Sequence, residues 1–243
     1  MDAQQVPAAV AGAIRPEDPY IIFHTILLII MRPDNALIIF VKYPEPGKVK
    51  TRLAADIGEE KAAHIYSLMA KKIIEKVLAP EDYQTFVFYD PPSETHRVND
   101  WLGAGDYELF PQSEGSLGSR IINSFDTVFS KGFKKTIIIG TDCIGVKSKL
   151  IREALYGLDN DDVAIGPAHD GGYYLLGLNS ATPQIFQDIE WSTESVLKQT
   201  LDKVNTSGLG HFLLETLNDI DTIQDITPQL LRELRLQVGL DSE

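Results

Sequence analysis

The sequence predicts an α/β fold in which helices cover both faces of a mixed, mostly parallel sheet. Short apolar runs, typical of buried strands, alternate along the chain with segments whose apolar residues recur every three or four positions, as in amphipathic helices. Two of the apolar runs are separated only by a Gly-containing loop, which indicates a hairpin. The alternation therefore predicts parallel strands with helical crossovers, and the hairpin adds at least one antiparallel strand.

Each expected element follows from this pattern. Strands are expected at residues 36–41, 85–90, 107–112, 135–142, 162–167, 173–178 and 211–216. Helices are expected at residues 59–78, 93–102, 121–129, 148–158 and 193–204, and a turn and helix at 219–240 close the chain. The Pro- and Gly-containing stretch 43–52 is expected to be a loop. Because open α/β sheets bind ligands at the carboxyl ends of their strands, the chemistry should lie in the loops that follow the strands.

Composition favours one domain that acts on a small molecule. The 243 residues are 44% hydrophobic and 23% charged, as in ordinary globular proteins. Acidic residues outnumber basic ones 35 to 22, and the formal charge of −13 argues against a nucleic acid or an anionic membrane as partner. The single cysteine permits neither an internal disulfide nor a cysteine zinc cluster, which favours a cytoplasmic location.

The first 33 residues are expected to form an N-terminal extension outside the core, and residues 34–243 to form a single domain. The stretch before Tyr20 is rich in Ala and Pro and has no periodicity. The apolar run 20–31 is shorter than the roughly 20 residues that span a bilayer. Acidic residues precede it and no small-residue cleavage site follows, so we expect neither stable membrane insertion nor export.

The loop after the first strand is a basic island in an acidic chain. Its basic residues are Lys42, Lys48, Lys50 and Arg52, against one acidic residue. Gly47 lets the backbone approach a ligand, and the helix that follows offers N-terminal amides to an anion. The loop therefore indicates a diphosphate-binding site, with a solvated basic loop as the alternative. It matches neither the Walker A pattern nor G-x-G-x-x-G.

Two later strand ends also carry candidate residues. The loop after the third strand contains Gly115, Gly118 and Arg120, which suit either contact with a nucleotide or an ordinary turn and helix cap. Asp142 follows the most strand-like segment. Hard cations such as Mg²⁺ or Mn²⁺ take one or two carboxylates from a protein, so Asp142 is a candidate metal ligand. A turn aspartate is the alternative.

Aspartates near the end of the chain complete the candidate set. Asp170 stands beside Gly171 and Gly172, where it could orient an acceptor or act as a base, or form a hairpin turn. Asp219 and Asp221 precede the last helix, and either could complete the metal site that Asp142 begins, or cap that helix. The basic loop and these aspartates together suit a reaction of a nucleotide diphosphate that depends on a divalent metal ion.

Six segments, taken in order, resemble a known family. They are LIIFVKYPEPGKVKTRLA, Q-x-x-G-x-L-G-x-R, IIIGTDC, GPAHDGGYYLLGL, Trp191-Ser192-Thr193 and DIDTIQDI. They look like a glycosyltransferase-A-like family of proteins described as nucleotide-diphospho-sugar transferases. That family is similar to phospholactate guanylyltransferases and, more distantly, to molybdenum-cofactor guanylyltransferases and sugar nucleotidyltransferases. The resemblance covers about residues 36–230.

The resemblance implies a three-layer α/β/α sandwich of the nucleotide-diphospho-sugar transferase fold. It implies that Lys50 and Arg52 hold nucleotide phosphates and that Asp142 and Asp221 bind the metal. The implied second nucleotide loop comprises Gln112, Gly115, Gly118 and Arg120, and the implied acceptor side runs from Asp170 through Gly171 and Gly172 to Tyr173. The chain departs from the family in lacking a true D-x-D motif, since residue 144 is Ile.

We expect a transferase that uses Mg²⁺ or Mn²⁺ to move a glycosyl group from a nucleotide sugar to a small-molecule or lipid-linked acceptor. Asp142 and Asp170 are the expected catalytic residues. The alternative enzyme is a nucleotidyltransferase, which would join a nucleoside triphosphate to a phosphorylated acceptor and release pyrophosphate. A nucleotide-binding protein without catalysis is a third possibility, suggested by the missing D-x-D.

Overall fold

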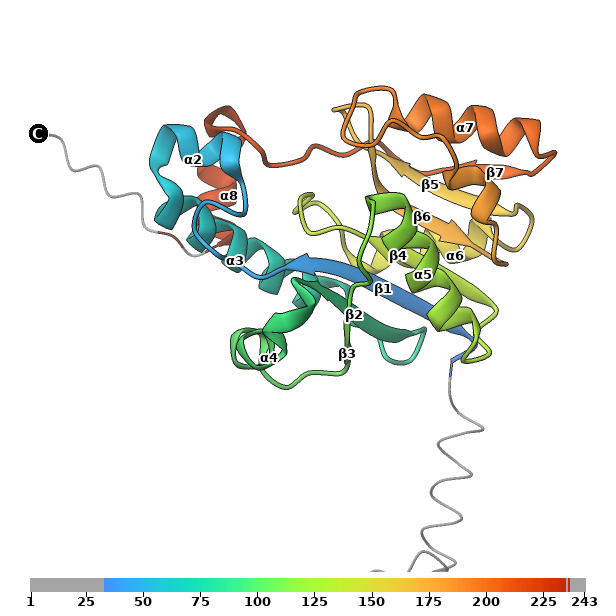
Figure 1. The fold of residues 1–243 in the computed structure, drawn as a ribbon, viewed down its shortest axis with the longest axis horizontal. Helices are drawn as coiled ribbons and strands as arrows, with labels where there is room; N and C mark the ends of the chain where they lie inside the picture. The colour runs from blue at the N-terminus through green and yellow to red at the C-terminus, as the bar shows by residue number, and fades with distance from the viewer. Residues whose placement is uncertain (1–32, 235, 237–243) are drawn as a thin grey trace, which may run out of the picture. The chain divides into compact units, whose positions relative to one another are not determined.

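Seven strands form one mixed sheet in the computed structural model, which describes residues 33–234 and residue 236 (Figure 1). The strands are β1 (Asn35–Lys42), β2 (Gln84–Asp90), β3 (Glu108–Pro111), β4 (Lys135–Ile139), β5 (Val163–Pro167), β6 (Tyr173–Leu178) and β7 (His211–Leu213). Their order across the sheet is β3-β2-β1-β4-β6-β5-β7. Within the described sheet only β6 runs against its neighbours. The predicted mixed, mostly parallel sheet and its hairpin are confirmed.

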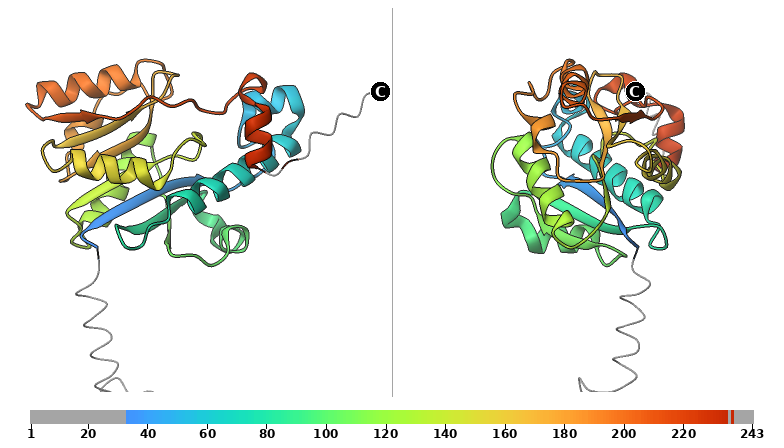
Figure 2. Two further views of the ribbon diagram at one scale, coloured as in Figure 1. Left: turned by 180° about the vertical axis from the view of Figure 1, so that it is seen from behind. Right: turned by 90° about the vertical axis from the view of Figure 1, so that its right-hand side faces the viewer.

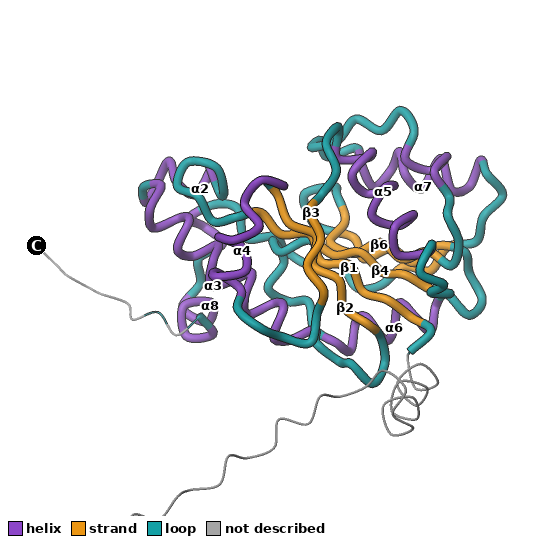
Figure 3. The backbone as a smooth tube through the Cα atoms, turned by 60° about the horizontal axis from the view of Figure 1, so that its bottom comes forward, coloured by secondary structure: helices purple, strands orange, loops and turns teal. Residues whose placement is uncertain are grey.

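Helices cover both faces of the sheet, which makes three layers (Figure 3). They are α2 (Thr51–Ile57), α3 (Glu59–Val77), α4 (Thr95–Leu102), α5 (Leu117–Phe129), α6 (Ser148–Gly157), α7 (Val196–Thr206) and α8 (Pro228–Glu233). Buried side chains of α3, α4 and α6 pack on one face. Those of α5, α7 and the short helix η2 (Pro183–Phe186) pack on the other. The predicted sandwich is therefore confirmed.

Strand β1, which lies between β2 and β4 inside the sheet, shows why a continuous apolar run predicts a buried parallel strand. Successive side chains of a strand point to opposite faces. Leu37 and Ile39 of β1 accordingly join the cluster with α3 and α6, while Ala36 and Ile38 join the cluster with α5. All four side chains are fully buried. A strand covered on both faces needs apolar residues at every position.

A smaller apolar cluster holds the end of the chain against the first helices. Leu53 of α2, Met69 of α3 and Leu230 of α8 are buried together, and Ile220 belongs to the same group. Figure 2 shows α8 beside α2, as Figure 1 does from the opposite side. This cluster brings the segment around residue 220 next to the basic loop that follows β1.

Several boundaries differ from the predicted ones. The stretch predicted as a loop up to residue 52 contains the start of α2, which forms because Leu53 is buried against α3 and α8. The helix whose amides were expected to face an anion is thus the seven-residue α2. Strand β4 ends at Ile139, where its pairing with Leu175 of β6 stops.

The remaining differences lie at helix and strand ends. Helix α4 begins at Thr95 after a short 3-10 turn, and α7 begins at Val196 because residues 193–195 form a bend and a turn. The predicted closing helix spans only Pro228–Glu233 among the described residues, and β7 is three residues long.

Predictions for the N-terminal extension concern residues 1–33, of which only Pro33 is described. The expectations about the apolar run 20–31 therefore lie outside the described residues, and the domain boundary stays a prediction. In the described part of the chain, no helix is both long and apolar enough to cross a membrane.

Candidate active site

A cleft of about 980 Å³ opens at the carboxyl ends of β1, β2 and β4. Strand β1 has β2 on one side and β4 on the other, so the cleft lies where the strand order reverses. Lys42, Asp90 and Asp142, each at or just beyond the end of one of these strands, line it. This is the position at which open α/β sheets bind ligands.

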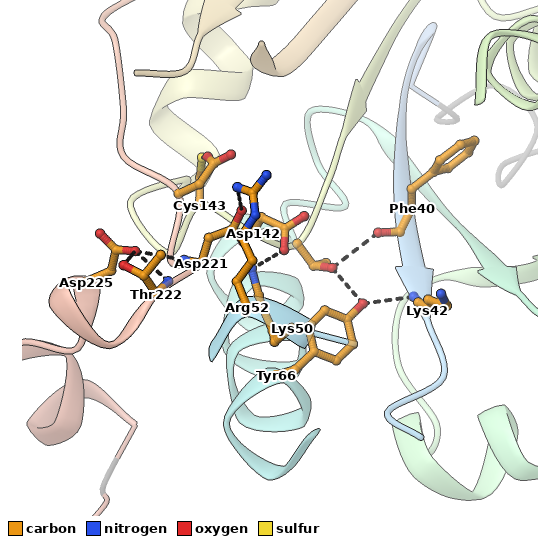
Figure 4. Close-up of polar contacts among 12 residues, drawn as sticks. Phe40, Lys42, Lys50, Arg52, Tyr66, Asp142, Cys143, Asp221, Thr222 and Asp225 are labelled. Carbon is orange, nitrogen blue, oxygen red and sulfur yellow. Dashed lines mark hydrogen bonds and ion pairs between the residues drawn. The ribbon is translucent and has the colours of Figure 1, made fainter. Parts of the chain in front are cut away.

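An ionic cluster of Lys50, Asp142 and Asp221 lies at this cleft (Figure 4). The Lys50 Nζ atom donates hydrogen bonds to Oδ1 of Asp142 and, at 2.9 Å, to Oδ1 of Asp221. Arg52 approaches the other oxygen of Asp221, with Nη1 3.7 Å from Oδ2. The Lys50 side chain is 3% exposed, whereas those of Asp142 and Asp221 are 52% and 39% exposed. The carboxylates therefore face solvent and the ammonium lies beneath them.

Lys50 is held charged and in an uncommon backbone conformation. Burial by itself would lower its pKa, but the negative charges and hydrogen bonds of Asp142 and Asp221 together raise it. Its φ and ψ are both 47°, in the left-handed region, where residues with a side chain are uncommon. Its carbonyl accepts a 2.8 Å hydrogen bond from the Ala54 amide, and so begins α2.

A chain of hydrogen bonds positions the loop that carries Asp142. The amide of Lys42 donates to the Tyr66 hydroxyl at 2.8 Å, and that hydroxyl lies 3.0 Å from Oγ1 of Thr141. Thr141 in turn donates to the Phe40 carbonyl at 3.4 Å. Burial raises the pKa of Tyr66 to about 12, so the hydroxyl keeps its proton at neutral pH. The chain links β1, α3 and the residue just before Asp142.

Asp221 is positioned by its neighbours in sequence and by the Asp142 loop. The Ile220 amide donates to the Asp142 carbonyl at 3.0 Å. The Asp221 amide donates to Oδ2 of Asp225 at 3.0 Å, and Asp225 also forms a capping box with Thr222. Asp225 thus caps the 3-10 turn Ile223–Asp225, and Thr227 caps α8, so the Asp221 carboxylate caps neither and is left for the ionic cluster.

Asp219 is a partly buried carboxyl group in the same cleft. It accepts a hydrogen bond from the Cys143 thiol. Burial raises its pKa to about 6, and the negative charges of Asp170 and Asp142 act in the same direction. Burial also raises the pKa of the Cys143 thiol, so this buried cysteine is not an activated nucleophile.

Gln112 and Arg120 form a connected pair at the floor of the cleft. The Gln112 side-chain amide donates to the carbonyls of Val41, at 3.3 Å, and Phe88, at 3.0 Å. Its oxygen accepts a 3.0 Å hydrogen bond from Nη1 of Arg120, which also lies 3.9 Å from the Asp90 carboxylate. Gln112 is thus fully engaged within the protein and orients Arg120, whose side chain is 26% exposed.

Two of the predicted glycines allow residues 191–194, here termed the 191–194 segment, to approach closely. A Cβ atom on Gly118 would lie 2.8 Å from Nε1 of Trp191. Gly171 has a φ of +88°, and a Cβ there would collide with the Glu194 carbonyl. The amide of Leu197 also donates to the Gly171 carbonyl at 2.9 Å. These glycines therefore position one wall of the cleft.

The structure brings most of the predicted site residues to the cleft. Those that line it are Lys42, Arg52, Gln112, Arg120, Asp142, Asp170, Gly172, Tyr173 and Asp221. Gly118 and Gly171 support the 191–194 segment instead, and Gly47 faces the carboxyl group of Glu59. Gly115 lies beside Ser119 in the turn before α5. The functional roles of all these residues stay predictions.

Other cleft residues did not stand out in the sequence. Asp90 ends β2, so the same strand-end rule that singled out Asp142 could have found it. Tyr66 lies on α3, many residues along the sequence from any strand end, and no local sequence pattern marks it as a site residue. The exposed residues Thr193 and Glu194 reach the cleft only because their segment folds back over Gly171.

The acidic pair of Asp142 and Asp221 suits a hard divalent cation. Among the described residues, no three His, Cys, Asp or Glu side chains are grouped so as to hold a metal ion by themselves. However, both carboxylates of the pair contact one nitrogen atom, so a single cation can reach both. Mg²⁺ is usually held by one or two carboxylates, with water and substrate phosphates as its other ligands. The donor set therefore fits such an ion.

Comparison with known proteins places the chain in a family. Residues 73–193 match the family described as "Uncharacterized protein conserved in bacteria (DUF2064)". A solved structure from Desulfovibrio desulfuricans G20, provisionally named a nucleotide-diphospho-sugar transferase, is 33% identical, with 79% of this chain and 84% of that chain covered and a TM-score of 0.75. The chain therefore belongs to the same family as this structure. No curated protein matches it.

More distant structures share the fold. A nucleotidyl transferase from Methanothermobacter thermautotrophicus is 15% identical over 83% of this chain and 98% of its own, with a TM-score of 0.56. The inositol-1-phosphate CTP transferase from T. maritima is 11% identical over 84% and 96%, with a TM-score of 0.51. At these identities the likeness shows only that this chain and the two structures share the α/β/α architecture.

We expect Gly171→Ala to unfold at a lower denaturant concentration than the wild type. Its positive φ costs an L-residue about 1–3 kcal/mol, and the added methyl group displaces the Glu194 carbonyl. Gly172→Ala is the matched control, because Gly172 has no positive φ and its Cβ would meet only the end of the Asp170 side chain, at 3.2 Å. Urea unfolding measures both. Equal destabilisation of the two variants would contradict the packing described for Gly171.

We also expect the thiol of Cys143 to be protected in the native protein. It is 2% exposed, its pKa is raised by burial, and it is the single cysteine of the chain. Reaction with a chromogenic disulfide reagent should be slow under native conditions and should reach one equivalent quickly in guanidinium. Native protein that reacts as fast as unfolded protein would show that the thiol is accessible.

Proposed function

We propose that the protein is a metal-dependent transferase that moves a glycosyl group from a nucleotide diphospho-sugar to an acceptor, either a small molecule or a lipid-linked one. One observation carries the proposal. Two acidic side chains from distant parts of the chain, Asp142 and Asp221, converge on one positively charged group, the Lys50 ammonium, at the edge of a large cleft. The 33% identical relative, with its provisional name, supports the same activity.

Positively charged side chains that line the cleft would bind the phosphates of the donor. Arg52 and Arg120 both line the cleft, and guanidinium groups form paired hydrogen bonds with phosphate oxygens. As the bond between sugar and diphosphate breaks, negative charge grows on the leaving diphosphate, and Arg52 would stabilise it there. Mg²⁺ or Mn²⁺ on the acidic pair would supply further positive charge at the same place.

The acceptor would enter from the side of Asp170 and Tyr173. Asp170 lines the cleft, and its Oδ1 accepts a 2.9 Å hydrogen bond from the Gly172 amide, which fixes the carboxylate in a turn. In the proposed reaction an acceptor hydroxyl loses its proton to Asp170 while its oxygen bonds to the sugar. The nucleoside diphosphate then leaves with the electron pair of the broken bond.

Nucleotidyl transfer is the second candidate, since structures of nucleotidyltransferases share this architecture. The same cleft would then hold a nucleoside triphosphate, and a phosphorylated acceptor would attack the α-phosphate. The two reactions release different products. Glycosyl transfer releases a nucleoside diphosphate, and nucleotidyl transfer releases pyrophosphate.

A donor screen with the Asp142→Asn variant tests the proposal. We expect either UDP-sugars or GDP-sugars to raise the melting temperature of the wild type in the presence of Mg²⁺ or Mn²⁺, and not in the presence of EDTA. The same donor should release nucleoside diphosphate when it is incubated with the protein. Asp142→Asn removes a charged ligand and should abolish both effects. Asp126→Asn, an exposed position on α5 away from the cleft, is the control.

Three results would each contradict a part of the proposal. A shift with triphosphates alone, accompanied by pyrophosphate release, would establish nucleotidyl transfer instead. Metal dependence that persists in Asp142→Asn would exclude this acidic pair as the metal site. Binding of a nucleotide without turnover of any donor would point to the non-catalytic alternative.

We expect Arg52→Ala to bind nucleotide more weakly than the wild type. A hydrogen bond to a charged group is worth about 1.5–3 kcal/mol. The Arg52 side chain is 75% exposed, so the lower end of that range, close to a tenfold loss, is expected. Calorimetric titration measures the change, with Arg52→Lys retaining part of the affinity. Equal affinity in Arg52→Ala would place the phosphates elsewhere.

A further inference from the structure

Lys50 occupies the position between the two proposed metal ligands. Its ammonium group contacts Asp142 and Asp221 together, and both contacts are hydrogen bonds as well as ion pairs. Among the ion pairs of the described residues, no other cationic side chain is as little exposed, the next being Lys135 at 19%. Lys50 is therefore enclosed by the protein, in contrast with Arg52, which borders the same pair from solvent.

We propose that Lys50 is the resident counter-cation of the Asp142–Asp221 pair and that a divalent metal ion binds there only by displacing it. Metal binding is then coupled to binding of a nucleotide diphosphate, whose oxygens supply the displaced ammonium with a new partner. This inference deepens the proposed function and rests on its assignment of the metal ligands, but not on which group is transferred.

The argument follows from the charges. Two carboxylates that contact one atom repel each other unless a cation lies between them. Lys50 supplies one positive charge at no cost in recruiting an ion, so half of the negative charge of the pair is already balanced in the protein without ligands. A metal ion that enters must break two charge-assisted hydrogen bonds and leave a nearly enclosed ammonium without partners, which is costly.

A diphosphate group removes that cost. A lysine ammonium is a compact charge with three donors on a flexible four-carbon side chain, so it can exchange carboxylate partners for phosphate oxygens. The metal ion in turn gains phosphate oxygens as ligands. Each ligand therefore strengthens the binding of the other by the same factor, as linkage requires. Lys50 would thus serve as phosphate ligand and metal competitor in turn.

The test measures Mn²⁺ binding without any nucleotide, by electron paramagnetic resonance of the free ion. Lys50→Met removes the ammonium and keeps most of the length of the side chain. We expect Lys50→Met to bind Mn²⁺ at least about tenfold more tightly than the wild type, within the usual range of coupling between sites. An affinity equal to or weaker than that of the wild type would overturn the proposal.

Two further variants isolate the cause. Lys48→Met makes the same charge change two residues away, on an exposed side chain, and should bind Mn²⁺ like the wild type. Lys50→Met combined with Asp142→Asn should lose the gain. A gain in Mn²⁺ affinity in Lys48→Met as large as that in Lys50→Met would mean that the effect is one of general electrostatics. A gain that persists when Asp142→Asn is added would place the ion elsewhere. Either result overturns the proposal.

A thermal-shift measurement keeps the inference testable if Lys50→Met is poorly folded. Wild-type protein should be stabilised by Mn²⁺ together with UDP or GDP, and not by Mn²⁺ alone at the same concentration. Stabilisation by Mn²⁺ alone that equals the joint effect would overturn the coupling. The donor screen separates the two ideas. Metal-dependent turnover without a gain in Lys50→Met refutes only this inference, and a gain without turnover refutes only the proposed transfer.

Discussion

The contact of Lys50 with Asp142 and Asp221 joins three loops that are far apart in the sequence. Residues 50 and 142 are 92 positions apart, and residues 50 and 221 are 171 apart. An enclosed ammonium has to be paired, because an isolated buried charge costs several kcal/mol. The pairing therefore constrains the basic loop, the end of β4 and the segment before α8 to meet at one place. The two carboxylates form one edge of the cleft.

Rigid elements behind the cluster keep the loops in position. The hydrogen bonds from Lys42 through Tyr66 to Thr141 connect β1, α3 and the Asp142 loop. The amide of Ile220 binds the carbonyl of Asp142, and Ile220 itself is buried among side chains of α2, α3 and α8. A site of this kind needs side chains whose orientation is set by packing and hydrogen bonds.

The opposite wall of the cleft depends on close packing rather than on charge. Gly118 and Gly171 leave room for Trp191 and for the Glu194 backbone, so the 191–194 segment lies directly against α5 and the β5–β6 hairpin. Sequence patterns singled out these glycines as ligand contacts. Tertiary packing gives them another partner, because a missing side chain serves equally for approach by a ligand and approach by the chain itself.

The sheet and several of the cleft residues could be predicted from the sequence, because apolar runs predict buried strands and strand ends converge in a parallel sheet. Asp142 and Arg120 could be placed in that way. Which charges pair could not be predicted in this way. From the sequence alone Lys50 is either a solvated or a phosphate-binding lysine, and the apolar cluster of α2, α3 and α8 is what brings Asp221 beside it. Long-range pairing leaves no local pattern, because it depends on where separate segments pack.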